Sequence, residues 1–170
     1  MLNIVIYGPP LSGKRTLLET LAGAGQLALT RFDVLIPALE VRGAVGARVV
    51  GSYSEEALDA STLSGGVFDE QCWGELVARA TSAVLVFDPQ QSREEEIARV
   101  IERASAMSGF PRRGCVVHSK QDLAPRRAMV ALSGTPFAGW PEFRSRFDRT
   151  ESMLAPFEWL VRSEAAAASR

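Results

Sequence analysis

The sequence predicts an α/β fold with a largely parallel sheet, and three observations lead to this prediction. Strand-like apolar runs alternate with amphipathic segments of helical spacing, a pattern typical of parallel sheets flanked by helices. The runs 82–87 and 114–118 are almost wholly apolar, which fits strands buried on both faces. The length of 170 residues suits a single domain with a substantial core. We expect about six strands in a mostly parallel central sheet.

The first third of the chain has clear boundaries. A strand over 2–7 leads into a glycine- and proline-rich loop at 8–13, and a helix is expected from 14 to 21, before a glycine-rich stop. The segments 32–41 and 47–53 both have an extended pattern, and we expect an antiparallel hairpin between them.

The middle of the chain continues the alternation. The polar segment 54–66 is expected to be a loop, and 69–80 a helix. After the buried strand 82–87, helical spacing over 92–107 begins with three glutamates, which the helix dipole favours in a first turn. The second buried strand, 114–118, follows.

The last third predicts a short helix over 125–132, a strand around 143–147 and a helix from 152 to about 165. The final segment, 164–170, is expected to be a frayed helix end. The domain organisation expected is therefore one domain over 1–163 with a short tail.

Composition and charge exclude several classes of protein. Hydrophobic residues make up 46% of the chain and charged residues 23%, so the chain is neither disordered nor a coiled coil. A net charge of −1 gives no basic field that would attract nucleic acid. The apolar runs are too short to span a membrane, and neither a signal peptide nor a prenylation motif is recognisable. Two cysteines without metal-ligand spacing, Cys72 and Cys115, fit reduced thiols, so we expect a cytoplasmic protein.

The strongest chemical signal is the loop 8–14, which reads Gly-Pro-Pro-Leu-Ser-Gly-Lys and matches the pattern G-x-x-x-x-G-K. Gly8 and Gly13 let the backbone curl so that successive N–H groups, including that of Ser12, point at a phosphate. The following helix adds its positive N-terminus, and Lys14 can reach the β- and γ-phosphates.

The motif breaks at the next residue. A phosphate-binding loop normally follows its lysine with Ser or Thr, whose hydroxyl ligates Mg²⁺. Here Arg15 occupies that position, and a guanidinium cannot ligate a cation. Thr16 is expected to point toward the α-phosphate. Phosphate binding therefore looks intact, whereas Mg²⁺ binding looks impaired.

The second signal, Ser119-Lys120-Gln121-Asp122, directly follows the buried strand 114–118. It matches N-K-x-D, with Ser119 in place of Asn. A carboxylate at Asp122 can accept from both N1–H and the 2-amino group of guanine, which adenine does not offer in that arrangement. Lys120 would pack its stem over the base. Of 19 basic residues only Lys14 and Lys120 are lysines, and both fall in these motifs.

With the two motifs in this order, the chain resembles the Ras-like small GTPases over essentially its full length. The resemblance implies a P-loop NTPase (Ras-like) fold that binds GTP or GDP. Within that superfamily it is most similar to the bacterial MglA-like branch, which regulates polarity in gliding motility. The segments that carry this similarity are 32–37, 63–69 and 83–90.

The departures from the family pattern concern catalysis. The resemblance places Gly65 at the γ-phosphate glycine, Gly66 at the glutamine that orients water, and Thr62 at the Mg²⁺-binding aspartate. Asp59 is a poor substitute because it lies too far before Gly65. Thr30 is the candidate for the metal-binding threonine of switch I. The late loop that backs the base has its best counterpart at 149–151.

Three function hypotheses follow. The first is a guanine-nucleotide-binding regulator with weak or absent intrinsic hydrolysis, for which the resemblance implies protein partners such as a roadblock-type dimeric activator. The second is a nucleotide-free pseudo-GTPase that serves as a scaffold for protein–protein interaction. A P-loop kinase is the third, and Asp122 argues against it because it disfavours adenine. The single histidine, His118, fits a neutral structural role, and Trp73 is a candidate partner contact.

Overall fold

A computed structural model describes residues 2–24, 34–35, 47–54, 74–75, 77–123 and 129–169. These residues form a sheet of six strands in the order β2-β3-β1-β4-β5-β6. The strands are β1 (Leu2–Gly8), β2 (Val34–Leu35), β3 (Ala47–Ser54), β4 (Ser82–Phe87), β5 (Gly114–His118) and β6 (Glu142–Arg144). All neighbours pair in parallel except β2, which runs antiparallel to β3. The predicted fold class is confirmed.

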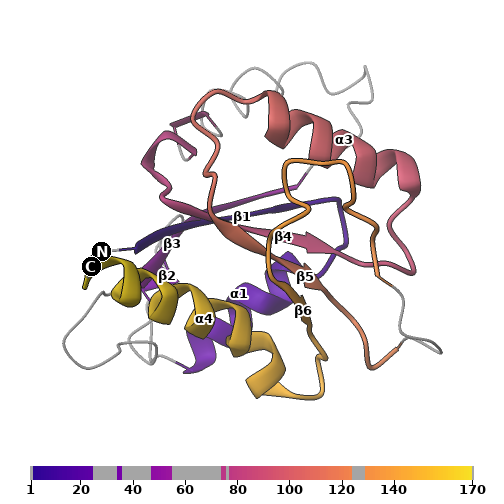
Figure 1. The fold of residues 1–170 in the computed structure, drawn as a ribbon. Helices are drawn as coiled ribbons and strands as arrows, with labels where there is room; N and C mark the ends of the chain where they lie inside the picture. Colours follow the sequence, from indigo (N-terminus) through magenta and orange to yellow (C-terminus); the bar gives the residue numbers. More distant parts are fainter. Residues whose placement is uncertain are drawn as a thin grey trace.

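Helices cover both faces of this sheet (Figure 1). Helices α1 (Lys14–Ala24) and α4 (Thr150–Ala168) lie on one face, and α3 (Glu94–Ala106) lies on the other. Residues 74–75 and 77–79 are also helical. No helix within the described part of the chain is long and apolar enough to cross a membrane.

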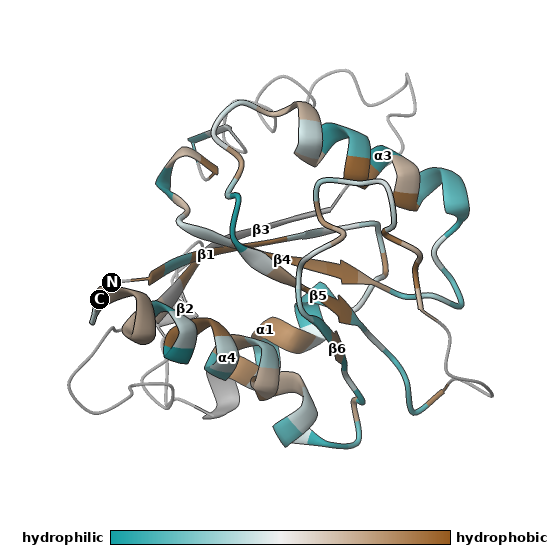
Figure 2. Ribbon diagram, in the orientation of Figure 1, coloured by the Kyte–Doolittle hydropathy of each residue, from teal (hydrophilic) through white to brown (hydrophobic). Residues whose placement is uncertain are grey.

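Each face of the sheet contributes alternate side chains to a separate core. In β1, Ile4 and Ile6 belong to the core under α1 and α4, whereas Val5 and Tyr7 belong to the core under α3. The same alternation continues through β4 and β5, and these central strands are largely brown in Figure 2. This period-2 burial on both faces explains why these strands read as uninterrupted apolar runs.

Most expected elements match the structure, and the differences lie near the C-terminal half. Strands 82–87 and 114–118 have the expected bounds. The predicted helix over 125–132 is wrong for residues 129–132, which are not helical, and the rest of it lies outside the described residues. The final strand ends at Arg144, not near 147, and α4 starts at Thr150 and continues through Ala168, beyond the expected end.

Candidate functional site

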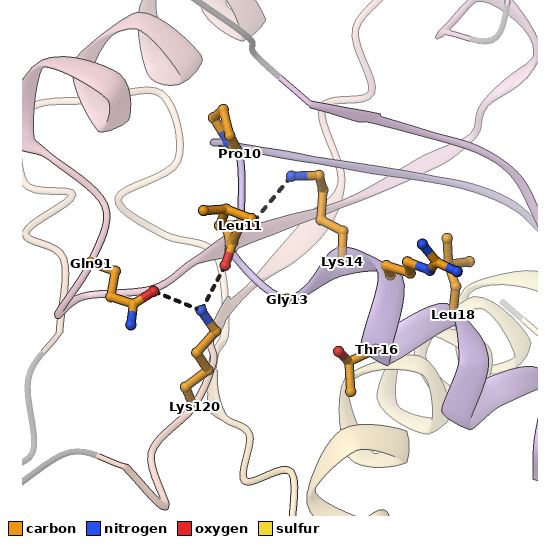
Figure 3. A pocket seen from close by; sticks show the side chains of 10 residues that line it. Pro10, Leu11, Gly13, Lys14, Thr16, Leu18, Gln91 and Lys120 are labelled. Atoms are coloured by element: carbon orange, nitrogen blue, oxygen red, sulfur yellow. Dashed lines mark hydrogen bonds between the residues drawn. The ribbon is translucent and has the colours of Figure 1, made fainter.

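The loop between β1 and α1 folds around the ammonium group of Lys14. Lys14 is 5% exposed, and its Nζ donates to the carbonyl of Gly8 at 3.0 Å, to Ser12 Oγ at 3.2 Å and to the carbonyl of Pro9. Figure 3 shows this side chain turned back toward the loop. An ammonium held inside a glycine-rich turn at a helix N-terminus is a cationic cradle suited to phosphate groups.

Two glycines of the loop leave no room for a side chain. A Cβ atom at Gly8 would collide with the carbonyl of Val86 in β4. Gly13 has a φ of 94°, and a Cβ atom there would lie 2.7 Å from Cζ of Phe147. Leu11 is also left-handed, with a φ of 56°. The loop conformation therefore depends on glycine at both motif positions.

The structure brings the second motif against this loop. Ser119 and Lys120 follow β5 directly, where parallel strands place their carboxyl ends at one edge of the sheet. The Ser119 hydroxyl donates to the carbonyl of Ser12 at 2.6 Å. Lys120 Nζ donates to the carbonyl of Leu11 at 2.7 Å, as Figure 3 shows. Two segments that were predicted independently from the sequence thus form one continuous site.

Asp88 anchors Lys120, a role that the sequence analysis missed. Its carboxylate is 1% exposed and lies 2.7 Å from Lys120 Nζ. The other carboxylate oxygen accepts the backbone N–H groups of Gln90 at 3.0 Å and Gln91 at 3.2 Å. An acidic residue directly after the buried strand β4 was the available signal, because a carboxylate at that edge faces the loops that follow neighbouring strands.

Asp122 contacts the loop after β6. Its Oδ1 accepts the backbone N–H of Phe147 at 3.0 Å, and the neighbouring Gln121 N–H donates to the carbonyl of Ser145 at 3.1 Å. These two contacts come from Phe147 and Ser145 and not from 149–151, the expected counterpart of the base-backing loop, whose role stays a prediction. Because β6 ends at Arg144, the segment beside Asp122 is 145–147, whereas Thr150 and Glu151 already belong to α4.

A cleft of about 540 Å³ opens beside the loop and Lys120 (Figure 3). Its volume lies within the range of small-molecule sites, roughly 300–1,000 Å³. Its described lining residues are Pro10, Leu11, Ser12, Gly13, Lys14, Arg15, Thr16, Leu18, Gln91 and Lys120. Asp122 and Phe147 do not line it.

Arg15 does not offer a metal ligand. Its side chain is 91% exposed, and Nε donates to Glu19 Oε1 at 2.8 Å, one turn further along α1. Within the described ranges, no group of three or more His, Cys, Asp or Glu residues is arranged to hold a metal ion. Mg²⁺ therefore does not fit the residue present at this position, because a guanidinium repels a cation.

Several predicted site residues lie outside the described residues. They are the residues expected in the two switch segments, together with the expected partner contact: Thr30, Asp59, Thr62, Gly65, Gly66 and Trp73. Their expected roles in metal binding, γ-phosphate contact, water positioning and partner contact stay predictions.

His118 is a buried structural residue at the end of β5. Its Nε2 lies 2.7 Å from Glu142 Oε2, and its Nδ1 accepts the backbone N–H of Val130 at 3.3 Å. Burial lowers the pKa of His118, although the carboxylate of Glu142 opposes that shift. This arrangement fits a neutral imidazole with its proton on Nε2. It agrees with the neutral structural role that the sequence predicted.

The strand order, the antiparallel β2 and the glycine-rich loop after β1 together define the fold of small G domains. Solved structures confirm this fold. The GDP-bound crystal structure of T. brucei IFT22 is 17% identical, with a TM-score of 0.60 over 98% of this chain and 97% of that one. The FeoB G-domain from Methanococcus jannaschii is 15% identical, with a TM-score of 0.60 over 95% of this chain and 97% of that one. No protein-family model and no curated protein sequence matches the chain.

Proposed function

We propose that this chain binds guanine nucleotides and acts as a Ras-like regulatory protein through protein partners. The observation that carries the proposal is the direct contact between the two motifs. Donors of Ser119 and Lys120 bind carbonyls of the phosphate loop that lie 107 and 109 residues earlier in the chain. This contact brings the cationic loop to the edge of the sheet that also carries Asp122, the carboxylate that we propose selects guanine.

The phosphate half of the proposed site is the cleft beside the loop. The backbone at Gly8, Ser12 and Gly13 would surround the phosphates, with Thr16 toward the α-phosphate. Lys14 would exchange its carbonyl contacts for phosphate oxygens, which are stronger partners for an ammonium because both groups are charged. The N-terminus of α1 adds a favourable dipole.

The base half rests on the motif after β5. Lys120 is held by Asp88 and by the loop, so its stem is fixed beside the cleft before any ligand arrives. Asp122 would accept from N1–H and the 2-amino group of guanine. A nucleotide with adenine offers neither of these donors in that arrangement, so it would gain no hydrogen bond from Asp122, which is the physical origin of the expected selectivity.

Hydrolysis is proposed to be weak or absent. Arg15, which pairs with Glu19, replaces the usual metal-binding hydroxyl, so we expect nucleotide binding without a strong Mg²⁺ requirement. Gly66 has no side chain with which to orient water. Turnover would need help in trans, where a supplied Arg or a repositioned water is worth about 10³–10⁵ in rate.

The partner class follows from the family resemblance. The GDP-bound state of T. brucei IFT22, which has a similar fold, supports a guanine nucleotide as the ligand. The finer assignment, to the bacterial MglA-like branch with a roadblock-type regulator, rests on segments 32–37, 63–69 and 83–90. We propose a cytoplasmic location and no nucleic-acid partner on the basis of composition.

A pseudo-GTPase scaffold is the second candidate, and one observation favours it. The polar groups that should meet a nucleotide are already partnered within the chain: the ammonium of Lys14 by loop carbonyls, and the carboxylate of Asp122 by a backbone N–H. A site that needs no ligand to satisfy its charges can persist empty.

Titration with fluorescent GDP and GTP tests the proposal, in Mg²⁺ and in EDTA, with fluorescent ADP as the base control. We expect the wild-type protein to bind GDP and GTP but not ADP. We expect Lys14→Ala to lose nucleotide binding altogether. Asp122→Ala should lose selectivity while keeping phosphate affinity. Glu19→Ala is the matched control, since it removes an exposed charge on α1 outside the cleft. No binding at millimolar GDP would favour the scaffold.

A further inference from the structure

We propose that Phe147 is an internal plug, whose ring occupies the base position and must move away before guanine can bind. The inference rests on the proposed function and deepens it, because it identifies a residue that regulates access to that site. Phe147 lies in the short loop between β6 and α4, and the sequence analysis gave it no role.

The ring of Phe147 lies against Gly13, the last glycine of the phosphate loop. A Cβ atom at Gly13 would meet Cζ of Phe147 at 2.7 Å and a second ring carbon at 3.4 Å, and Ser119 Oγ lies at 3.4 Å from the same point. The ring therefore fills the space between the last glycine of the phosphate motif and the first residue of the base motif. Its half-buried side chain also packs against the core under α1 and α4.

The backbone of the same residue engages the group that should recognise guanine. The N–H of Phe147 donates to Asp122 Oδ1 at 3.0 Å. A base that binds Asp122 through two of its own N–H groups must share the carboxylate with this donor, which leaves Oδ2 and a further lone pair of Oδ1 for the base. One residue thus meets Gly13 with its ring and Asp122 with its amide.

These two contacts lie along the path that a bound nucleotide must follow. Its phosphates would be held at the loop ending in Lys14, and its base would be held at Asp122. The cleft reaches the loop and Lys120, but Asp122 and Phe147 do not line it. The cleft therefore opens beside the phosphate cradle in this conformation, whereas the half-buried carboxylate of Asp122 lies outside it.

The loop that carries Phe147 has anchors that do not depend on the ring. The Ser145 hydroxyl donates to the carbonyl of Ser152 at 2.9 Å, which ties the start of the loop to α4. Arg146 and Asp148 form an ion pair at 2.7 Å in which both side chains are exposed to solvent. Phe147 can therefore swing outward while β6 and α4 stay in place.

A plug lowers the apparent affinity for the whole nucleotide by the fraction of molecules in which it is open. If the open form makes up about a tenth of the population, GDP binds about tenfold more weakly than the site itself allows. Pyrophosphate, which has no base, needs only the phosphate cradle. It should be insensitive to the plug.

The experiment compares wild-type protein, Phe147→Ala and Phe143→Ala. Phe143 is the matched control because it is a half-buried phenylalanine of β6 that packs against the same core and lies beside Trp159, away from the loop. Affinities for GDP and for pyrophosphate are measured by calorimetry, and the rate of binding of fluorescent GDP is measured by stopped flow. Far-ultraviolet circular dichroism establishes that each variant is folded.

The plug predicts that Phe147→Ala tightens GDP binding by about tenfold and changes pyrophosphate affinity by less than about twofold, with Phe143→Ala like wild type. In wild-type protein the binding rate should level off as GDP increases, because opening becomes limiting. In Phe147→Ala it should rise in proportion to GDP. This kinetic difference holds even if the variant is less stable.

The remaining outcomes separate two failures. Unchanged or weaker GDP binding in Phe147→Ala, with guanine selectivity retained, would overturn the plug and leave the proposed function intact. Weaker binding would make the ring a stacking surface for the base. If neither wild-type protein nor Phe147→Ala binds GDP at millimolar concentration, the proposed function fails. The plug then fails with it, because there would be no nucleotide site for the ring to block.

Discussion

Replacing Asp88 tests whether the base motif is organised before any ligand arrives. Asp88 is 1% exposed, and the Lys120 side chain that faces it is 14% exposed. Asp88→Asn retains an oxygen for the N–H groups of Gln90 and Gln91 but removes the charge that meets the lysine. The variant separates the ion pair from the turn that the same carboxylate closes.

The magnitude follows from this burial. Removing one partner of a fully buried pair costs about 3–5 kcal/mol. Lys120 keeps some contact with water and retains the carbonyl of Leu11 as an acceptor, so we expect a cost below that range, about 2–3 kcal/mol for Asp88→Asn. Asp88→Ala also loses the two hydrogen bonds of the turn and should be destabilised by about a further 1–2 kcal/mol.

Urea unfolding monitored by circular dichroism and tryptophan fluorescence measures both values. Asp148→Asn is the control, since its partner Arg146 is exposed and such pairs contribute about 0–1 kcal/mol. The reasoning is refuted if Asp88→Asn unfolds within about 0.5 kcal/mol of wild type, because an uncompensated lysine would then carry no penalty.

Three further predictions concern pH, metal and packing. Because burial lowers the pKa of His118 below its unfolded value of about 6.5, the unfolded chain binds the proton first, and stability should fall as pH drops below that value. Urea midpoints at pH 7.5 and 5 should therefore diverge in wild type more than in His118→Gln; parallel behaviour would contradict this. Wild-type GDP affinity should be the same in EDTA, whereas Arg15→Thr should make it Mg²⁺-dependent; a wild-type loss in EDTA would show that metal is used. Gly8→Ala should lower stability by about 1–3 kcal/mol, seen as an earlier thermal transition, because its Cβ meets the Val86 carbonyl; an unchanged transition would show that the loop yields.

The central strands were predictable because strands that are buried on both faces consist almost entirely of apolar residues. β4 and β5 are flanked on both faces, so every position except His118 at the end of β5 is apolar or small, and the runs have sharp ends. β6 was harder to bound because Glu142 and Arg144 are exposed at the edge of the sheet. There, pairing with β5 decides the strand, and that pairing is not visible in a local pattern.

The site was predictable where chemistry follows sequence spacing. Lys14 and the segment 119–122 belong to short motifs whose strand context fixes their position, so both were found. Asp88 acts through a lysine far along the chain, and Phe147 acts through its backbone N–H and the place of its ring. Neither contact has a local signature, because each depends on which loops the parallel sheet brings together.

The donors of the site bind the main chain of the phosphate loop. Lys14, Ser119 and Lys120 all hold the loop by its main-chain carbonyls, at Gly8, Pro9, Leu11 and Ser12. Carbonyl groups are common to every amino acid, so most side chains between the two glycines take no part in these contacts. The exception is Ser12, whose Oγ also accepts from Lys14. Sequence identity can therefore be low while the fold is retained, which is consistent with identities of 15–17% beside TM-scores of 0.60.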